Sequence, residues 1–355
     1  MAKVFFSRRV VSEINDIVKY REKKYLSRYD LYVDLFKKFG LKVTDLVPLR
    51  NVYLLFTDKG KKILKKVEYS KENLQFIYEA VEYIRRSFNR VISFTKTSEG
   101  EIYAIWNGEL YCVMDVAEGR EAQFSNPIDV SIAVKSIAEM HKASEGYRCN
   151  YPEKCMLGRA IDNFNRRLEE LRFFKELALL HEYKSGFDEV FLSHVDSYIK
   201  EVEESIKFLS STPYLKLCSE EDKKVICHHD LADHNILINE DKAFFIDFDF
   251  AIIDLRVHDL CNFINKAVKN FVFDLEKANS IVEEYSAINP LDKRELDVLK
   301  AFLSFPEDFY NISKDYYARR KEWEEETFLD RLMRKLEYKE YRDEFLSKFL
   351  SGITC

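Results

Sequence analysis

The sequence is poor in glycine and proline and has no long hydrophobic run. Only 9 of its 355 residues are Gly and 6 are Pro. This scarcity excludes collagen-like and low-complexity chains and favours long, uninterrupted helices. No stretch approaches the ~20 apolar residues that cross a bilayer, and the short run Val4-Phe5-Phe6 does not make a secretory signal. We therefore expect a chain that is cytoplasmic when synthesised and has no membrane partner.

Paired cysteine motifs and an excess of positive charge are also missing. The 7 cysteines include no C-x-x-C pair, and Cys112, Cys227 and Cys261 lie in apolar runs. This pattern favours buried free thiols over disulfides or a zinc site. The net charge is −6, so we expect no nucleic-acid partner.

The residues that are present predict two lobes. The chain is longer than the ~250–300 residues at which a single hydrophobic core stops growing. Its front part contains a hairpin pattern at residues 51–56 and 63–67, followed by one helix at 70–86. Further strand-like runs follow at residues 91–97, 102–106 and 110–116. One or two helices are expected before them, over residues 10–39.

From residue 129 onward, helical patterns dominate, over residues 129–144, 161–180 and 190–209. A mixed segment at 223–254 resembles small β-ribbons, and helices then continue to the end. We expect an α+β, bilobal fold with a β-rich lobe at residues 1–117 and a mainly helical lobe at residues 118–355.

One segment of the second lobe carries a polar pattern typical of phosphoryl transfer. Residues 228–235 read HHDLADHN, and Asp247 follows twelve residues after Asn235 in an apolar run. This fits the H-x-D-L-x-x-x-N and D-F-x elements of phosphotransferases with the protein-kinase fold. Asp230 is the candidate base that accepts the substrate's proton. Asn235 and Asp247 are candidate Mg²⁺ ligands, since amide and carboxylate oxygens suit a hard cation.

Two other interpretations stay open for this segment. Asp and Asn between short strands are often simple turn residues. Alternatively, His228, His229 and His234 could bind a transition metal with Asp230, as His–Asp pairs do in metal-dependent phosphohydrolases. That class needs further ligands on helices, whereas this segment has the pattern of loop and ribbon. We interpret His228 as a brace for the loop and assign no role to His229 or His234.

With this motif in place, the sequence resembles the aminoglycoside phosphotransferase and choline kinase group, and within it the CotS-type spore coat proteins. The resemblance covers nearly the whole chain, including residues 49–53, 137–144 and 316–323. It implies a bilobal protein-kinase-like fold with ATP and Mg²⁺ as cofactors and a small-molecule hydroxyl or amino acceptor. It also implies association with the spore coat, where other coat proteins would be partners.

The resemblance further implies a lysine that binds the nucleotide phosphates and a glutamate that pairs with it. The lysine falls on Lys65, in the second strand of the hairpin. The glutamate should project from the following helix, whose apolar face is set by Leu74, Ile77, Val81 and Ile84. Glu82 lies about 100° from the centre of that face and Glu79 about 160°, so Glu82 is the candidate.

Three more sets of residues follow from the resemblance. The hinge, whose backbone groups would hold the adenine, spans Met114, Asp115, Val116 and Ala117. Asp259 corresponds to a buried aspartate that supports the catalytic loop. Asp249 replaces the glycine of D-F-G and is a candidate to assist a second metal ion.

The sequence also departs from protein kinases. No glycine lies between Leu41 and Lys59, so there is no G-x-G-x-x-G loop over the phosphates. Only eleven residues separate Asp247 from Asp259, which leaves no room for an activation loop. We therefore expect a small-molecule kinase. The alternative is a catalytically weak or inactive kinase-fold protein that assembles the coat, suggested also by tyrosines expected to be exposed near the carboxyl end.

Overall fold

The structure is a computed structural model that describes residues 33–49, 52–268 and 273–349. Its internal contacts divide the chain into two compact units. Unit 1 combines residues 1–147 with 230–251, and unit 2 combines residues 148–229 with 252–355. The predicted boundary between lobes at residues 117 and 118 stays a prediction. Of the helices predicted over residues 10–39, residues 33–38 are helical, and the part before residue 33 lies outside the described residues.

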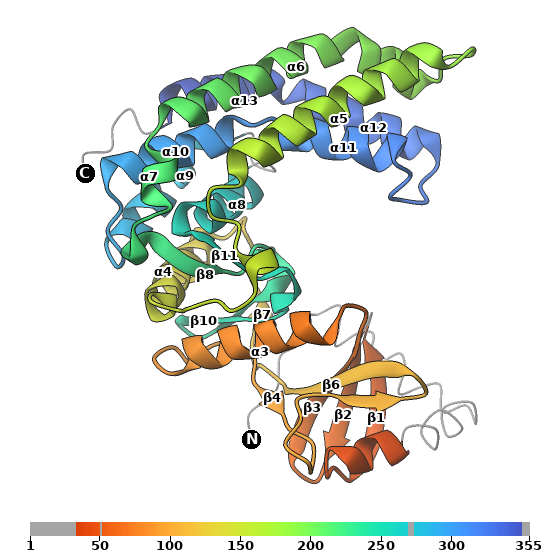
Figure 1. Ribbon diagram of the computed structural model, residues 1–355, viewed down its shortest axis with the longest axis vertical. Helices are drawn as coiled ribbons and strands as arrows, with labels where there is room; N and C mark the ends of the chain where they lie inside the picture. The colour runs from red at the N-terminus through yellow and green to blue at the C-terminus, as the bar shows by residue number, and fades with distance from the viewer. Residues whose placement is uncertain (1–32, 50–51, 269–272, 350–355) are drawn as a thin grey trace. The chain divides into compact units, whose positions relative to one another are not determined.

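The described part of unit 1 contains a six-stranded antiparallel sheet (Figure 1). Its strands follow the order β1–β2–β3–β6–β4, and β5 also pairs with β6. Their bounds are β1 (Val43–Leu49), β2 (Val52–Thr57), β3 (Gly60–Val67), β4 (Phe94–Thr95), β5 (Ala104–Trp106) and β6 (Glu109–Asp115). The sheet confirms the small antiparallel sheet predicted from the sequence, with β2 and β3 as its predicted hairpin.

One strand of this sheet, β1, was not predicted. Asp45 and Pro48 interrupt its strand pattern, and its register shifts near Val43. Proline is tolerated there because β1 is an edge strand, where one side of the backbone needs no partner in the ladder.

Helix α3 (Lys71–Arg85) is the predicted inserted helix of unit 1. It begins where the Ser70 side chain accepts a hydrogen bond from the Asn73 amide, which satisfies one of the free N–H groups at a helix start. Its buried face packs against α4 (Pro127–Ser144). Helix α4 in turn covers a small sheet of β10 (Lys242–Phe245), β9 (Ile236–Asn239) and β7 (Arg120–Glu121). Two 3-10 turns flank that ribbon, η3 (Asp233–Asn235) and η4 (Phe248–Phe250).

Unit 2 is mainly helical, as predicted. Strands β8 (Lys224–Cys227) and β11 (Ile252–Leu255) pair antiparallel. The helices are α5 (Ala160–Leu180), α6 (Gly186–Ser211), α7 (Tyr214–Leu217), α8 (Arg256–Val268), α9 (Leu275–Ser286), α10 (Lys293–Ser304), α11 (Glu307–Tyr317), α12 (Glu325–Glu337) and α13 (Lys339–Lys348), with 3-10 turns η1 (Pro152–Lys154) and η2 (Glu221–Lys223). Among the helices in the described ranges, none is long and apolar enough to cross a membrane.

Aromatic rings fill the core between the long helices of unit 2. The Phe187 and Tyr316 rings stack with their centroids 3.9 Å apart, and the Tyr198 and Phe309 rings stack at 3.8 Å. Tyr310 is also buried. The expectation that the tyrosines near the carboxyl end are exposed was therefore wrong for Tyr310 and Tyr316, which pack in this core, but it is confirmed for Tyr338 and Tyr341, which are exposed.

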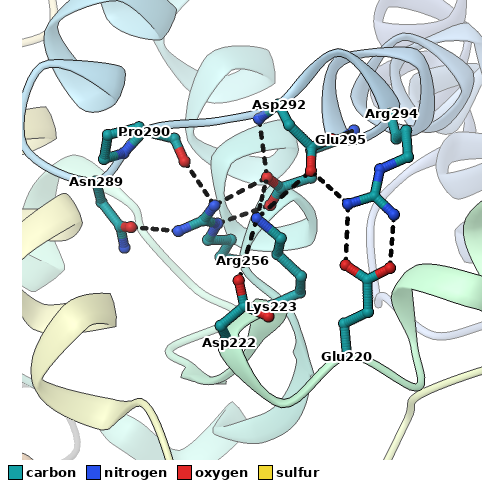
Figure 2. Close-up of polar contacts among 9 residues, drawn as sticks. All are labelled: Glu220, Asp222, Lys223, Arg256, Asn289, Pro290, Asp292, Arg294 and Glu295. Carbon is teal, nitrogen blue, oxygen red and sulfur yellow. Dashed lines mark hydrogen bonds and ion pairs between the residues drawn. The ribbon is translucent and has the colours of Figure 1, made fainter.

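A buried ionic network in unit 2 joins strand β8 and helix α8, which precede and follow the polar motif along the chain (Figure 2). Arg256 at the start of α8 and Glu295 in α10 are 3% and 1% exposed. They form a two-point pair, with Nε–Oε1 at 2.7 Å and Nη2–Oε2 at 2.8 Å. Lys223, next to β8, reaches the same carboxylate at 3.0 Å. The Arg256 guanidinium also donates to the Asn289 side chain and the Pro290 carbonyl. One carboxylate therefore ties together the beginnings of β8, α8 and α10.

Candidate active site

A pocket of about 380 Å³ lies entirely within unit 1. This volume is in the range of small-molecule sites, ~300–1,000 Å³. Its walls contain eight of the residues that the sequence nominated, namely Lys65, Met114, Asp115, Val116, Ala117, Asn235, Asp247 and Asp249. The structure therefore brings together a strand lysine, the segment at the end of β6 and the polar motif, which are far apart in the sequence.

The pocket has an apolar part and a charged part. The apolar lining comes mainly from Val52, Ile63, Ile77, Ile92, Phe94, Leu237 and Ile246. The charged lining includes Lys65 from β3, Asp247 and Asp249 from the turn after β10, and also Asp115 at the end of β6 and Glu121 in β7. Such a cavity suits a ligand with a flat apolar ring and an anionic, metal-binding tail.

Lys65 is the positive centre of this pocket. Its ammonium lies 2.7 Å from an Asp247 carboxylate oxygen and 2.6 Å from an Asp249 oxygen. Burial alone would lower the pKa of Lys65, but the charges of Asp249 and Asp247 outweigh it and raise that pKa above its usual value. Lys65 therefore stays charged, and its ammonium group lies between the Asp247 and Asp249 carboxylates.

The proposed base and one proposed metal ligand are joined directly. The Asn235 side chain is 2% exposed and donates from Nδ2 to both the Asp230 carbonyl and Asp230 Oδ2, each at 2.9 Å. These bonds fix which end of the amide is oxygen, and so leave Oδ1 as the end that can face a cation. Asp247 has a left-handed backbone with φ 64°, a conformation that is uncommon outside glycine and concentrates at functional sites.

The donor set fits a hard divalent cation. Asn235, Asp247 and Asp249 line one pocket and offer one amide and two carboxylates, the oxygen ligands that Mg²⁺ prefers. The position already accommodates a positive charge, because the Lys65 ammonium touches both carboxylates. Asn235 and Asp247 could therefore hold a Mg²⁺ ion, with Asp249 beside them in contact with Lys65.

In unit 2, Asp259 supports the backbone just before the proposed base. Asp259 is fully buried and accepts the backbone N–H groups of His228 at 2.6 Å and His229 at 2.8 Å. His228 is also fully buried. A carboxylate that accepts two adjacent amides holds the backbone in one conformation, which is what the predicted bracing role requires.

The structure does not bring Glu82 to Lys65. Within the described residues, Glu82 pairs with Arg85 at 3.4 Å, whereas Lys65 contacts Asp247 and Asp249. The predicted face was too narrow, because Phe76 and Ala80 are buried as well. Including them moves the centre of the buried face by roughly 40° away from Glu82, so Glu82 points outward and Ile77 is the residue of α3 that lines the pocket.

The end of β6 is held in place around Asp115. Its backbone N–H donates to the Ser93 carbonyl at 2.9 Å, and its carboxylate accepts from Lys62 and from the Ser93 hydroxyl. Burial would raise the pKa of Asp115, but these two side chains lower it overall. The Asp115 side chain is thus committed to the sheet, consistent with a hinge that acts through its backbone.

Two pocket residues were missed by the sequence reasoning. Gly119 has φ 153°, and a Cβ there would lie 2.9 Å from the Ile238 carbonyl oxygen, so the close approach of the hinge segment to β9 requires glycine. Tyr69 donates its hydroxyl to Asp249 Oδ1 at 2.9 Å. Only the glycine has a sequence signal, since glycine is scarce in this chain.

The histidines of the motif do not form a metal cluster. The His229 ring packs edge-on against the His258 ring, with centroids 4.9 Å apart, whereas His234 pairs with Asp233 at 3.3 Å. Within the described residues, no group of three or more His, Cys, Asp or Glu side chains is placed to share a metal ion. The geometry therefore does not support the phosphohydrolase alternative.

We predict that His229 makes the protein sensitive to acid. Burial, together with the neighbouring His258, lowers the pKa of His229 to about 4, below the ~6.5 of an unfolded histidine. Unfolding therefore takes up a proton between these values. The free energy of unfolding is therefore unaffected by this titration above pH 6.5 and falls as the pH is lowered toward 4. The total loss is about 3 kcal/mol.

The pH dependence of the melting temperature checks this prediction. His229 has a left-handed backbone with φ 64°, which asparagine tolerates. His229→Asn should therefore flatten the fall in melting temperature between pH 6.5 and 4. His234→Asn, at an exposed site of the same loop, serves as the control. Identical slopes in all three proteins would show that His229 is not the titrating group.

Comparison with solved structures shows that the fold is that of kinase-like phosphotransferases. An aminoglycoside phosphotransferase from Alicyclobacillus acidocaldarius superposes with a TM-score of 0.77 at 20% identity, over 88% of this chain and 93% of that one. Spectinomycin phosphotransferase APH(9)-Ia, solved with ADP and spectinomycin, superposes with a TM-score of 0.64 at 16% identity, over 89% and 98%. This confirms the predicted fold class.

The sequence comparisons identify the family to which the chain belongs within this fold. Residues 33–349 match the sequence model of the spore coat putative kinase YutH family, and the chain belongs to that family. It is 25% identical to spore coat protein S of Bacillus subtilis over 304 residues, which cover 84% of this chain and 86% of that protein. It is 22% identical to the endospore coat-associated protein YutH of Bacillus subtilis, over 79% and 81%.

Proposed function

We propose that this protein binds ATP and Mg²⁺ in the pocket of unit 1 and transfers the terminal phosphoryl group to a small hydroxyl or amino compound. One observation carries the proposal: Lys65 and Asp247, 182 residues apart in sequence, meet at 2.7 Å in one pocket that also contains Asn235 and the end of β6. A phosphate-binding lysine, candidate metal ligands and a hinge segment, which phosphoryl transfer requires together, thus line one pocket. Solved neighbours of this fold hold ADP, or AMP-PNP with Ca²⁺, which supports a nucleotide and a divalent ion here.

Each residue then has a role. The apolar wall and the backbone at residues 114–117 would hold the adenine, and Lys65 would bind the phosphates. Asn235 and Asp247 would bind Mg²⁺, which supplies charge neutralisation when bound. Asp230, oriented by the Asn235 amide, would accept the proton of the attacking group. His228 and Asp259 would keep the preceding backbone in place.

We further propose that the protein works at the spore coat, with other coat proteins as partners. The family is described as a spore coat family, and the two Bacillus subtilis relatives are named as coat or coat-associated proteins. The alternative, a kinase-fold coat component without turnover, is favoured by the β1–β2 connection. No glycine lies between Leu41 and Lys59, so strands β1 and β2 carry no glycine-rich sequence of the kind that covers the phosphates in protein kinases.

The melting temperature with and without ATP plus Mg²⁺ tests the site. Ligand at a hundredfold its dissociation constant adds ~2.7 kcal/mol of stability, a rise of roughly 2 °C for a chain of this length. We expect this rise in the wild type and in Asp241→Asn, an exposed control in the turn between β9 and β10. It should disappear in Asp247→Asn. An equal rise in melting temperature in Asp247→Asn would show that Asp247 does not take part in binding ATP and Mg²⁺.

A further inference from the structure

Lys65 lacks the helix glutamate that its assigned role calls for. A lysine that binds phosphates needs an anion on its other side, because a long side chain without an anchor loses much rotamer freedom when it binds. Helix α3 presents Ile77 to the pocket, and Glu82 is engaged with Arg85. The anchor must therefore come from another element of unit 1.

Asp249 has the geometry of such an anchor. Its Oδ2 lies 2.6 Å from the Lys65 ammonium, and its Oδ1 accepts the Tyr69 hydroxyl at 2.9 Å. Each carboxylate oxygen thus has its own donor, which fixes the rotation of the group. Asp247 also contacts Lys65, but the proposed function reserves Asp247 for the metal ion, so Asp249 is the carboxylate left to hold the lysine.

Tyr69 is held firmly enough to orient this carboxylate. Its ring packs against a buried apolar cluster made of Val67, Leu74, Ile102 and Cys112. Burial, reinforced by the charge of Asp249, raises the pKa of Tyr69 well above its usual value. The hydroxyl is therefore protonated and acts as a donor throughout the neutral range.

We propose that Asp249, oriented by Tyr69, anchors Lys65 in place of a glutamate from α3, and that Tyr69 is a positioning residue of the nucleotide site. The inference rests on the proposed function for its purpose, although the contact between Tyr69 and Asp249 can be tested without any ligand. It also explains why the third residue of the D-F-x element is an aspartate: a glycine there would leave Lys65 with Asp247 alone.

The first test is the affinity for ATP in the presence of Mg²⁺, measured by calorimetric titration. Tyr69→Phe removes one hydroxyl and keeps the ring in its cluster. A lost hydrogen bond to a charged group corresponds to about tenfold in affinity, and we expect the dissociation constant to rise by that factor. Tyr103→Phe removes a hydroxyl from another ring packed on the same cluster, and should leave the constant unchanged. An unchanged constant in Tyr69→Phe, or an equal rise in Tyr103→Phe, would overturn the inference.

The second test is a double-mutant cycle on the ligand-free protein. If Tyr69 acts through Asp249, Tyr69→Phe should lower the melting temperature by about 2 °C in the wild-type background and by less than half of that in Asp249→Asn. Additive shifts would overturn the inference, whatever the nucleotide result. Failure of the wild type to bind ATP would instead refute the proposed function, and the ligand-free cycle would still decide whether Tyr69 orients Asp249.

Discussion

Replacing Asp230 by Asn is expected to lower phosphoryl transfer by ~10²–10⁴-fold, the usual contribution of a general base. The amide cannot take the acceptor's proton, yet its oxygen can still accept the hydrogen bond that Asn235 donates at 2.9 Å. The loop should therefore keep its shape, and the affinity for ATP should stay within about twofold, since a contact outside the nucleotide contributes little to its binding.

The assay is the rate of ADP release with the acceptor that gives the wild type its highest rate. Asp233→Asn is the matched control, because Asp233 is an exposed aspartate of the same loop that pairs with the adjacent His234. Unchanged turnover in Asp230→Asn would show that another group removes the proton. A wild type that binds ATP and releases no ADP with any acceptor would favour the coat component without turnover.

Replacing Glu295 by Ala is expected to destabilise unit 2 by about 3–5 kcal/mol, the typical loss when one partner of a buried ion pair is removed. The Glu295 carboxylate forms ion pairs with both Arg256 and Lys223 inside the protein (Figure 2). Without it, Arg256, at 3% exposure, would stay buried and charged beside the neutral oxygens of Asn289 and Pro290 and without its carboxylate partner.

Urea unfolding monitored by circular dichroism measures this loss. Glu221→Ala is the control, because Glu221 is 80% exposed in its pair with Lys224, and exposed pairs contribute ~0–1 kcal/mol. Similar midpoints for the two variants would mean that the network in Figure 2 adds no net stability. Because Arg256 lies three residues before Asp259 on α8, loosening this network should also weaken the support of the loop at His228.

The sequence predicted the parts of this protein that follow from local patterns. The β2–β3 hairpin is marked by a turn signal between two apolar runs, and α3 by its cap at Ser70 and its apolar spacing. The motif at residues 228–235 was recognisable because the spacing of Asp230, Asn235 and Asp247 is a chemical requirement that does not depend on the surrounding fold.

The parts that could not be predicted depend on tertiary contacts. β1 contains Asp45 and Pro48, and only its position at the sheet edge makes it a strand. The partner of Lys65 was assigned to Glu82 from the helix period, but burial of Phe76 turned that residue outward. Tyr69 carries no sequence signal, because its role requires Asp249, which lies 180 residues further along the chain.

A titration of the wild-type protein with ATP, in the presence and absence of Mg²⁺, tests the central claim most directly. The arrangement of Lys65, Asn235, Asp247 and Asp249 in one pocket predicts one nucleotide bound per chain, with a clearly higher affinity when Mg²⁺ is present. No binding under either condition would contradict the claim that this pocket is a nucleotide site, and binding that does not respond to Mg²⁺ would contradict the roles of Asn235 and Asp247.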